Sequence, residues 1–347
     1  MFCVLRLRTL DPQATMMMPK TKNPRVDDDR VEMADPSRLN LACGVPMTAN
    51  DDACAAPSNA IHVATGLDSS YLRHGEGVAF ATWARALGSS NPSRPMSVVI
   101  LTDGIGDAQQ CMIRATVRKY LSQGSVVRTM DVQETLDSSI TGKLHLLVHV
   151  SRITMARLLL PKLLPPCVRK TIWIDLDALV LAPLDSLFAV DQTAADSTGT
   201  RSCGIAGRES IVSNYLAGSY VGPDRDARLS SLRSVVTFNA GVSVMDLEFL
   251  RGSPEYEQTV TKYAFTQGND DQVTLNLWCD GRYVKVDPKW NVFNNMVDKD
   301  PMLGESLESW GVAHFAGHPK PWDDKKPYFA NEKMKRAWKK HAVNIWG

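Results

Sequence analysis

Two clusters of polar side chains, about 140 residues apart, suggest a site where a divalent metal ion bridges a diphosphate. The apolar run that begins at Thr171 ends in Asp175 and Asp177, with Leu176 between them. Because alternate side chains of a strand share one face, both carboxylates can point at one cation while Leu176 turns into the core. Carboxylate oxygens are the ligands that Mg²⁺ and Mn²⁺ prefer.

The second cluster spans residues 314 to 322 and contains His314, Gly317, Lys320 and Trp322. An imidazole ligand from His314 favours Mn²⁺ over Mg²⁺. Lys320 supplies a positive charge for a phosphate, and Gly317 lets the backbone approach an anion. His314 also has a structural interpretation, as a buried and hydrogen-bonded core histidine. The tight clustering favours the ligand interpretation.

Three further places in the chain, with five polar residues between them, have two interpretations each. Arg157 is either the polar face of a surface helix or a cation that leans over the site toward a phosphate or sugar. Asn239 lies in an apolar strand and needs partners, either backbone groups or sugar hydroxyls. Asp270, Asp271 and Gln272 begin a helix, where the acids either cap it or act in the site.

Two aspartates separated by one residue after an apolar strand are also typical of haloacid-dehalogenase-type phosphatases. In those enzymes the pair sits in the first strand, and Thr or Val is typical at the position that Leu179 holds here. Both features differ in this chain, so phosphoryl chemistry is disfavoured.

The 347 residues, 44% of them hydrophobic, are enough for one large core, so we expect a tail over residues 1–58 and one catalytic domain over 59–347. A nucleic-acid partner is disfavoured, because 39 basic residues balance 38 acidic ones. Short apolar runs alternate with helical segments, which predicts an α/β fold with a largely parallel sheet covered on both faces. The predicted strands are 61–65, 96–104, 125–131, 238–245 and 283–286, and the helices are 72–88, 107–122, 255–265, 271–279 and 331–342. Residues 191–233 are predicted to form one strand and a long excursion.

Seven cysteines are scattered along the chain without a CxxC pair: Cys3, Cys43, Cys54, Cys111, Cys167, Cys203 and Cys279. This spacing predicts neither a zinc site nor a disulfide framework. No apolar stretch reaches the roughly 20 residues that span a bilayer, and arginines interrupt residues 1–8 too early for a signal peptide. The default expectation is the cytoplasm, with the Golgi lumen as the alternative if the true N-terminus lies upstream.

Together these residues resemble glycosyltransferase family 8, a retaining group that includes glycogenin, lipopolysaccharide galactosyltransferases and plant galacturonosyltransferase-like proteins. The resemblance runs through residues 61–325, and residues 62–73 look most like the plant branch. It implies the GT-A nucleotide-diphospho-sugar transferase fold. Asp246 departs from the asparagine common at its place, and residues 191–233 have no counterpart in the family pattern.

The resemblance also implies roles for individual residues. Mn²⁺, or Mg²⁺ in its place, would be held against the diphosphate of a UDP-sugar by Asp175, Asp177 and His314. The phosphates would contact Gly317 and Lys320, and the uridine pocket would be lined by Thr65, Asp68 and Tyr71. The donor sugar and the approaching acceptor would be surrounded by Arg157, Asn239, Ala240, Asp271 and Gln272.

The implied reaction is retaining transfer of a hexosyl or uronosyl group from a UDP-sugar to a hydroxyl of a glycan, glycoconjugate or protein. Gln272 is a poor nucleophile, which favours attack on the face that the diphosphate leaves. Two other functions remain open: a non-catalytic protein that binds sugar nucleotides or glycans, and a self-glucosylating protein like glycogenin. The second needs a surface tyrosine, for which the candidates are Tyr215, Tyr220 and Tyr328.

Overall fold

The computed structural model describes residues 53–72, 75–145, 151–194, 199–210, 214–293, 306–317, 320–322 and 331–342. Its strands are β1 Ile61–Asp68, β2 Met96–Asp103, β3 Val126–Asp131, β4 Lys170–Ile174, β5 Ala178–Val180, β6 Ile205–Glu209, β7 Phe238–Asp246, β8 Val284–Lys285, β9 Val292–Phe293 and β10 Val312–His314. Its α-helices are α2 Gly75–Ser90, α3 Asp107–Arg118, α4 Gln133–Ser139, α5 Leu160–Leu163, α6 Asp185–Phe188, α7 Tyr215–Ser219, α8 Arg225–Ser234, α9 Leu247–Arg251, α10 Pro254–Thr259, α11 Asp271–Cys279 and α12 Glu332–His341. Short 3₁₀ helices span Ala53–Ala55, Ser69–Leu72, Arg152–Leu159, Pro288–Asn291 and Leu307–Ser309, and a π-helix spans Val260–Thr266.

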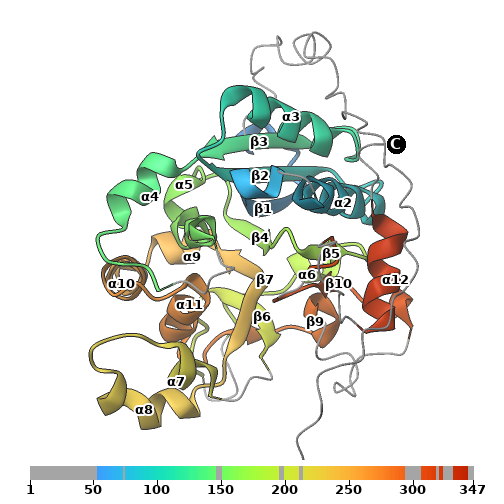
Figure 1. Ribbon diagram of the computed structural model, residues 1–347. Coiled ribbons are helices and arrows are strands. Elements are labelled where there is room, and N and C mark those ends of the chain that lie inside the picture. Colours follow the sequence, from blue (N-terminus) through green and yellow to red (C-terminus); the bar gives the residue numbers. More distant parts are fainter. Residues whose placement is uncertain are drawn as a thin grey trace, which may run out of the picture.

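The central sheet has seven strands in the described part of the chain, in the order β3-β2-β1-β4-β7-β6-β8 (Figure 1). Strands β1 to β4 run parallel, whereas β7 runs antiparallel to both β4 and β6. All but the last residue of β2 is buried, as expected for an apolar strand covered on both faces. The predicted α/β class with a mostly parallel sheet is confirmed.

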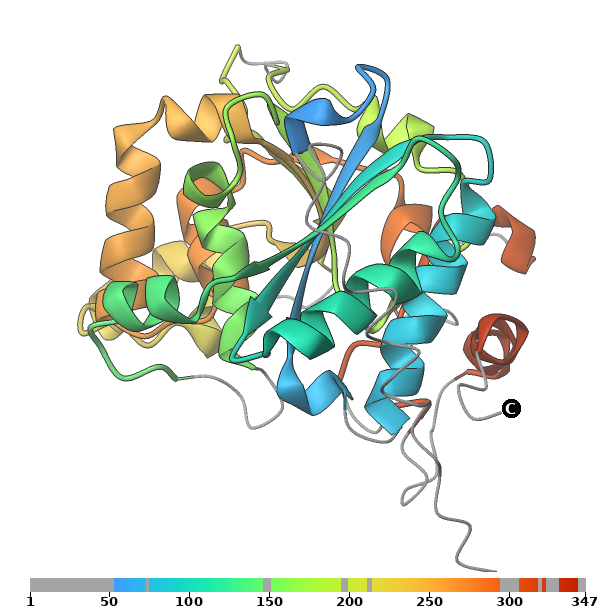
Figure 2. The ribbon, with the colours of Figure 1, turned by 90° about the horizontal axis from the view of Figure 1, so that it is seen from above.

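Helices cover both faces of this sheet, as the view from above shows (Figure 2). Successive side chains of a strand point to opposite faces. Val63 of β1 accordingly packs in the cluster that contains Trp83 of α2, and Ala64 packs in the cluster that contains Met155 of the 3₁₀ helix Arg152–Leu159. The second cluster also includes Leu275 of α11, so this face carries the elements that reach the candidate site.

The prediction that Asp175 and Asp177 continue the apolar strand is wrong, because β4 ends at Ile174. The chain turns there, and the amide of Ala178 donates to the carbonyl of Asp175 at 3.0 Å. A second sheet, in the order β5-β10-β9, begins directly after this turn and places His314 opposite Ala178. The turn therefore brings the carboxylates beside the histidine, although strand alternation does not aim them.

Residues 191–233 contain more regular structure than predicted. One strand, β6, is present as expected, and the helices α7 and α8 follow it. Leu216, Tyr220 and Leu232 from this segment pack against Val273 of α11. The excursion therefore adjoins the helix that begins at Asp271.

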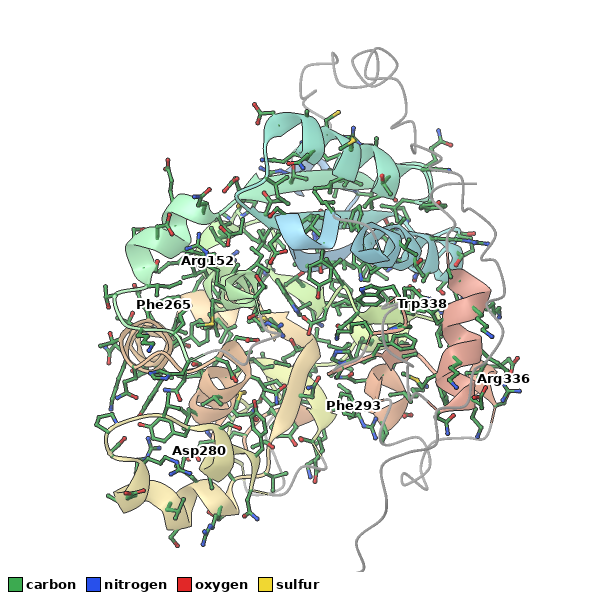
Figure 3. The ribbon with its side chains drawn as sticks, viewed as in Figure 1. Arg152, Phe265, Asp280, Phe293, Arg336 and Trp338 are labelled. Carbon is green, nitrogen blue, oxygen red and sulfur yellow. A yellow bond between two sulfur atoms is a disulfide. The ribbon has the colours of Figure 1, made fainter. Side chains whose placement is uncertain are left out.

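The ends of the chain are described only in part. Of the tail predicted over 1–58, residues 1–52 lie outside the described residues, and the rest includes the short helix Ala53–Ala55. The basic helix α12 packs through Trp338 on its inner side, while Arg336 lies on its outer side (Figure 3). Among the described residues, no helix has the length and apolar character needed to cross a membrane.

Two disulfides correct the expectation from the cysteine spacing. Cys54 is bonded to Cys167 and Cys203 to Cys279, and Cys111 is also disulfide-bonded. The sequence separations are 113 and 76 residues, so the fold rather than the local spacing brings the partners together. The Cys203–Cys279 bond ties the segment before β6 to the end of α11.

Replacing both Cys203 and Cys279 with alanine is expected to lower the free energy of unfolding by about 2–4 kcal/mol, because a long cross-link restricts the unfolded chain. Urea denaturation of the oxidised protein and of the double variant measures this difference. A thiol reductant also cleaves the Cys54–Cys167 bond, so it should destabilise the wild type by at least as much as the double substitution. Equal midpoints for oxidised wild type and variant would show that this bond does not stabilise the fold.

Candidate functional site

A cavity of about 270 Å³ lies where β4 and β7 meet the turn that carries the carboxylates. Its walls come from segments far apart in the chain. They include Gly66, Tyr71, Ser151, Ile153, Thr154, Arg157, Trp173, Asp175, Leu176, Asp177, Tyr215, Asn239, Ala240, Gly241, Asp270, Asp271, Gln272, His314, Ala316, Gly317 and Lys320. Most of the residues predicted from the sequence therefore meet in one place.

Three side chains in this cavity are arranged like the ligands of a metal ion. One donor atom from each of Asp175, Asp177 and His314 lies within 4.8 Å of the other two. Nε2 of His314 is 3.2 Å from Oδ1 of Asp177 and 3.9 Å from Oδ2 of Asp175. This set of two carboxylate oxygens and one imidazole nitrogen suits Mn²⁺ or a similar divalent ion.

The carboxylate of Asp175 is oriented by two donors on one of its oxygens. Oδ1 accepts from Nε1 of Trp173 at 2.6 Å and from Nη2 of Arg157 at 2.7 Å. The indole of Trp173 is buried, and the guanidinium carbon of Arg157 also lies over it, 4.7 Å from the ring centroid. Oδ2 is consequently the oxygen that faces His314.

Asp177 is oriented in the same manner by Lys320. The ammonium of this lysine donates to Oδ2 of Asp177 and to the carbonyl of Phe315, the latter at 2.9 Å. Burial alone would raise the pKa of the Asp177 carboxyl, but Lys320 and His314 outweigh it and hold that pKa well below its usual range. The carboxylate is therefore ionised at neutral pH, as a metal ligand must be.

Gly241 makes room for this donor set. A Cβ atom at this position would lie 2.2 Å from Cε1 of His314 and 2.8 Å from Oδ2 of Asp175. Both distances are below van der Waals contact, so a larger residue would displace one donor. The packing around the three donors therefore fits a bound cation, and His314 is at once buried, hydrogen-bonded and close to both carboxylates.

The opposite wall of the cavity is built around Arg157. Its Nε lies 2.7 Å from Oδ2 of Asp271, and its Nη1 donates to the carbonyl of Ala240 at 2.5 Å. The side chain is only 2% exposed, which rules out the interpretation as the polar face of a surface helix. Burial raises the pKa of Asp271 to about 6, although Arg157 opposes this shift. The guanidinium thus joins Asp175 on the metal side to Asp271 on the other.

Asn239 and Gln272 contact each other on this wall. Nδ2 of Asn239 donates to Oε1 of Gln272 at 2.8 Å, and the amide of Ala240 donates to the same oxygen at 3.1 Å. Asp270 caps α11 by accepting from the amide of Val273 at 2.7 Å, as its capping interpretation predicts. Two hydrogen bonds from β7 therefore hold the side chain of Gln272 in place, and Asp270 serves as the N-cap of α11.

Of the three residues predicted to line the uridine pocket, one lies in the cavity wall, one contacts a wall residue and one lies away from the wall. Tyr71 lines the cavity, and Asp68 accepts a hydrogen bond from Ser151, which also lines it. Thr65 is fully buried in β1 and is not part of the wall. Gly317 has a φ of +83°, and a Cβ atom there would meet nothing within 4 Å, so backbone conformation rather than crowding explains this glycine.

Sequence reasoning missed Trp173 and Asn291, and it named Tyr215 only as a possible surface acceptor for self-glucosylation. Trp173 is hidden in the apolar run before Asp175, where an aromatic residue is ordinary. Tyr215 lines the cavity from α7, and its phenol bonds with Gln272 and Ser219. Of the other tyrosines named as possible acceptors, Tyr220 is 1% exposed and Tyr328 lies outside the described residues.

Comparison with known proteins places this chain in a family of enzymes that transfer sugars. The family model described as glycosyl transferase family 8 matches residues 62–326. General stress protein A of Bacillus subtilis is 22% identical over 289 residues, which cover 77% of this chain and 90% of that protein. Probable galacturonosyltransferase-like 10 of Arabidopsis thaliana is 24% identical over 302 residues, covering 83% and 78%.

Solved structures show the same fold. A crystal structure of the galactosyltransferase LgtC, in complex with donor and acceptor sugar analogs, superposes with a TM-score of 0.58 at 18% identity, covering 81% of this chain and all of that one. Mouse xyloside xylosyltransferase 1 in its apo form gives a TM-score of 0.51 at 15% identity, covering 77% and 99%.

The sheet, the cavity and these similarities define the chain as a glycosyltransferase with the GT-A fold. Its family follows from the length of the match, which takes in most of the chain. The protein belongs to glycosyl transferase family 8, as its sequence motifs predict.

Proposed function

We propose that the protein transfers a sugar from a UDP-sugar to a hydroxyl acceptor with retention of anomeric configuration, and that Mn²⁺ acts with the leaving diphosphate. The observation that carries this proposal is the orientation of the two aspartates. One oxygen of Asp175 is used by Trp173 and Arg157, and one oxygen of Asp177 by Lys320, so the remaining oxygens face His314.

Each side chain contributes to this reaction in its own way. Asp175, Asp177 and His314 would hold the cation, which when bound supplies positive charge to the diphosphate as the anomeric bond breaks. Lys320 places a second positive charge beside Asp177, where it can bind a phosphate oxygen. The amide oxygen of Gln272 already accepts two hydrogen bonds. Gln272 therefore positions its neighbours rather than attacking carbon, which favours attack from the face that the diphosphate leaves.

The charges in the cavity favour a neutral donor sugar. Among the described residues that line the cavity, the cations are Arg157 and Lys320, and carboxylates already pair with both. A uronate would bring a further negative charge toward Asp270 and Asp271. Like charges in such a site cost affinity, so kcat/KM for a UDP-uronate should be at least about 10-fold below that for the best neutral UDP-hexose.

UDP release tests both the role of the metal and the preference for a neutral sugar. It is measured with Mn²⁺ or with EDTA for five donors: UDP-glucose, UDP-galactose, UDP-xylose, UDP-galacturonate and UDP-N-acetylglucosamine. Turnover of a neutral donor that EDTA abolishes supports the proposal. Preference for UDP-galacturonate would contradict the argument from charge, and turnover that EDTA leaves unchanged would contradict the role of the metal. UDP binding without any turnover would favour a non-catalytic binding protein.

Self-glucosylation is a second candidate, because Tyr215 lines the cavity. Its phenol is already engaged by Gln272 and Ser219, so we expect transfer to an external acceptor instead. Intact-mass measurement after incubation with the donor panel and Mn²⁺ decides between them. An added hexose that disappears in Tyr215→Phe would establish self-modification.

A further inference from the structure

A series of hydrogen-bonded amide side chains links the metal side of the cavity to the wall around Arg157; Asn291 is buried behind the cavity, and Asn239 and Gln272 are half-buried in its wall. Oδ1 of Asn291 lies 2.9 Å from Nδ1 of His314, and Nδ2 of Asn291 donates to Oδ1 of Asn239 at 3.0 Å. Asn239 in turn donates to Gln272. Asn291 is fully buried and lies outside the cavity wall, so it contacts the site only through these residues.

Backbone amides fix which way the side-chain amides of Asn239 and Gln272 are oriented. A backbone N–H can only donate, and Gly241 donates to Oδ1 of Asn239 at 3.0 Å while Ala240 donates to Oε1 of Gln272. The amide of Asn239 therefore has its oxygen toward Asn291. Asn291 must turn its NH₂ group to that oxygen, which leaves its own oxygen facing His314.

An amide oxygen accepts hydrogen bonds and cannot donate them. Nδ1 of His314 must therefore carry a proton in order to bond with Asn291, and Nε2 of the neutral ring is left with its lone pair. Nε2 is the atom that lies 3.2 Å from Asp177 and within reach of a shared cation. This series of amides thus selects the tautomer that a metal ligand at Nε2 requires.

Asn291 is itself held firmly. It ends the 3₁₀ helix Pro288–Asn291, and its carbonyl accepts from Nη1 of Arg208 at 2.6 Å. That arginine is 2% exposed and stacks on Phe293, 5.1 Å from the ring centroid (Figure 3 labels Phe293). A side chain anchored in this way can impose an orientation on a neighbouring imidazole.

We propose that Asn291 is a positioning residue that sets the tautomer and orientation of His314 for metal binding and couples the histidine, through Asn239, to Gln272. The inference rests on the proposed function, because it assumes that His314 is a metal ligand. It assigns Asn291 no contact with substrate.

The tautomer can be measured without turnover and without a variant of Asn291. Nitrogen-15 spectra of the metal-free wild-type protein should show His314 protonated at Nδ1, with its signals identified by their absence in His314→Gln. A ring protonated at Nε2 and not at Nδ1 would overturn the proposal, whatever the enzyme's activity.

Variants of Asn291 then test its hydrogen bond to His314 and its hydrogen bond to Asn239 separately. Asn291→Leu removes both hydrogen bonds and should weaken Mn²⁺ binding, measured by electron paramagnetic resonance, by about 10–100-fold. Asn291→Asp keeps an acceptor for Nδ1 but cannot donate to Asn239, so Mn²⁺ should bind within a few-fold of wild type while kcat falls. Unchanged Mn²⁺ affinity in folded Asn291→Leu, or an equal loss in both variants, would contradict the proposal.

Asn91 provides a matched control, because it is also a buried asparagine with hydrogen bonds at both ends of its amide. It donates to the carbonyl of Leu87 and accepts from the amide of Leu184, both at 2.9 Å, and it does not line the cavity. Asn91→Leu should lower stability and leave Mn²⁺ affinity unchanged. If wild type fails to bind Mn²⁺ but His314 is protonated at Nδ1, the metal assignment fails while the hydrogen-bond argument stands.

Discussion

Replacing Asp177 with alanine is expected to reduce Mn²⁺-dependent sugar transfer by more than about 10³-fold. Losing one preorganised group in such a site typically costs about 10²–10³ in rate, and this variant removes a metal ligand as well as the partner of Lys320. Rates of UDP release at saturating donor and a range of Mn²⁺ concentrations measure the effect. The Mn²⁺ requirement should rise together with the loss of kcat.

Two further variants separate the loss of a ligand from a loss of fold. Asp177→Asn keeps the shape of the side chain but not its charge, so it should also be nearly inactive. Asp185→Ala removes an exposed aspartate whose partner, Arg94, is partly exposed and lies outside the cavity wall, and this variant should transfer sugar like the wild type. Full Mn²⁺-dependent activity in folded Asp177→Ala would refute the metal assignment.

Replacing Arg157 with methionine is expected to lower the free energy of unfolding by about 3–5 kcal/mol at pH 8, because it leaves Asp175 and Asp271 without their shared cation. The loss should shrink at acidic pH. Burial already raises the pKa of Asp271 to about 6, and without Arg157 this pKa rises further, so the carboxyl of Asp271 takes up a proton at pH 5 in the folded variant and the cost of burying its charge is removed. Urea denaturation at pH 8 and pH 5 measures the difference.

The exposed pair formed by Arg169 and Glu248 supplies the control, since screening by water makes such pairs weak. Arg169→Met should leave the urea midpoint almost unchanged at both pH values. A destabilisation by Arg157→Met that is equal at pH 5 and pH 8 would show that lost packing against Trp173, rather than lost charge pairing, is the cause.

The fold was predictable wherever a local pattern carries it. The apolar strand at residues 96–104 and the helix at 271–279 appear within a residue of their predicted bounds, because a buried strand and a capped helix leave a local signal. The disulfides were not predictable, because the partners lie 76 and 113 residues apart and no local rule pairs them.

The residues of the site likewise divide into those that leave a local signal in the sequence and those that do not. Asp175, Asp177 and His314 stand out in the sequence as polar residues in apolar surroundings, and the structure brings them together. Asn291 and Trp173 reach the donor residues through hydrogen bonds to other side chains, and these depend on the tertiary fold. The turn after Ile174 shows the limit of strand periodicity, since the two aspartates converge because the backbone bends.

Strand β7 has a consequence for how this enzyme can change its substrates. Asn239, Ala240 and Gly241 are consecutive, and they contact Gln272, Arg157 and Asp175 in turn. The strand is paired with β4 at residues 242–246 and with β6 at residues 243–245 and 238, so the sheet holds both ends of the segment that makes these contacts. We therefore expect the spacing between leaving group and acceptor to stay constant among relatives of this protein, and new acceptors to arise from replacements on α7, which contributes Tyr215 to the cavity wall without belonging to the sheet.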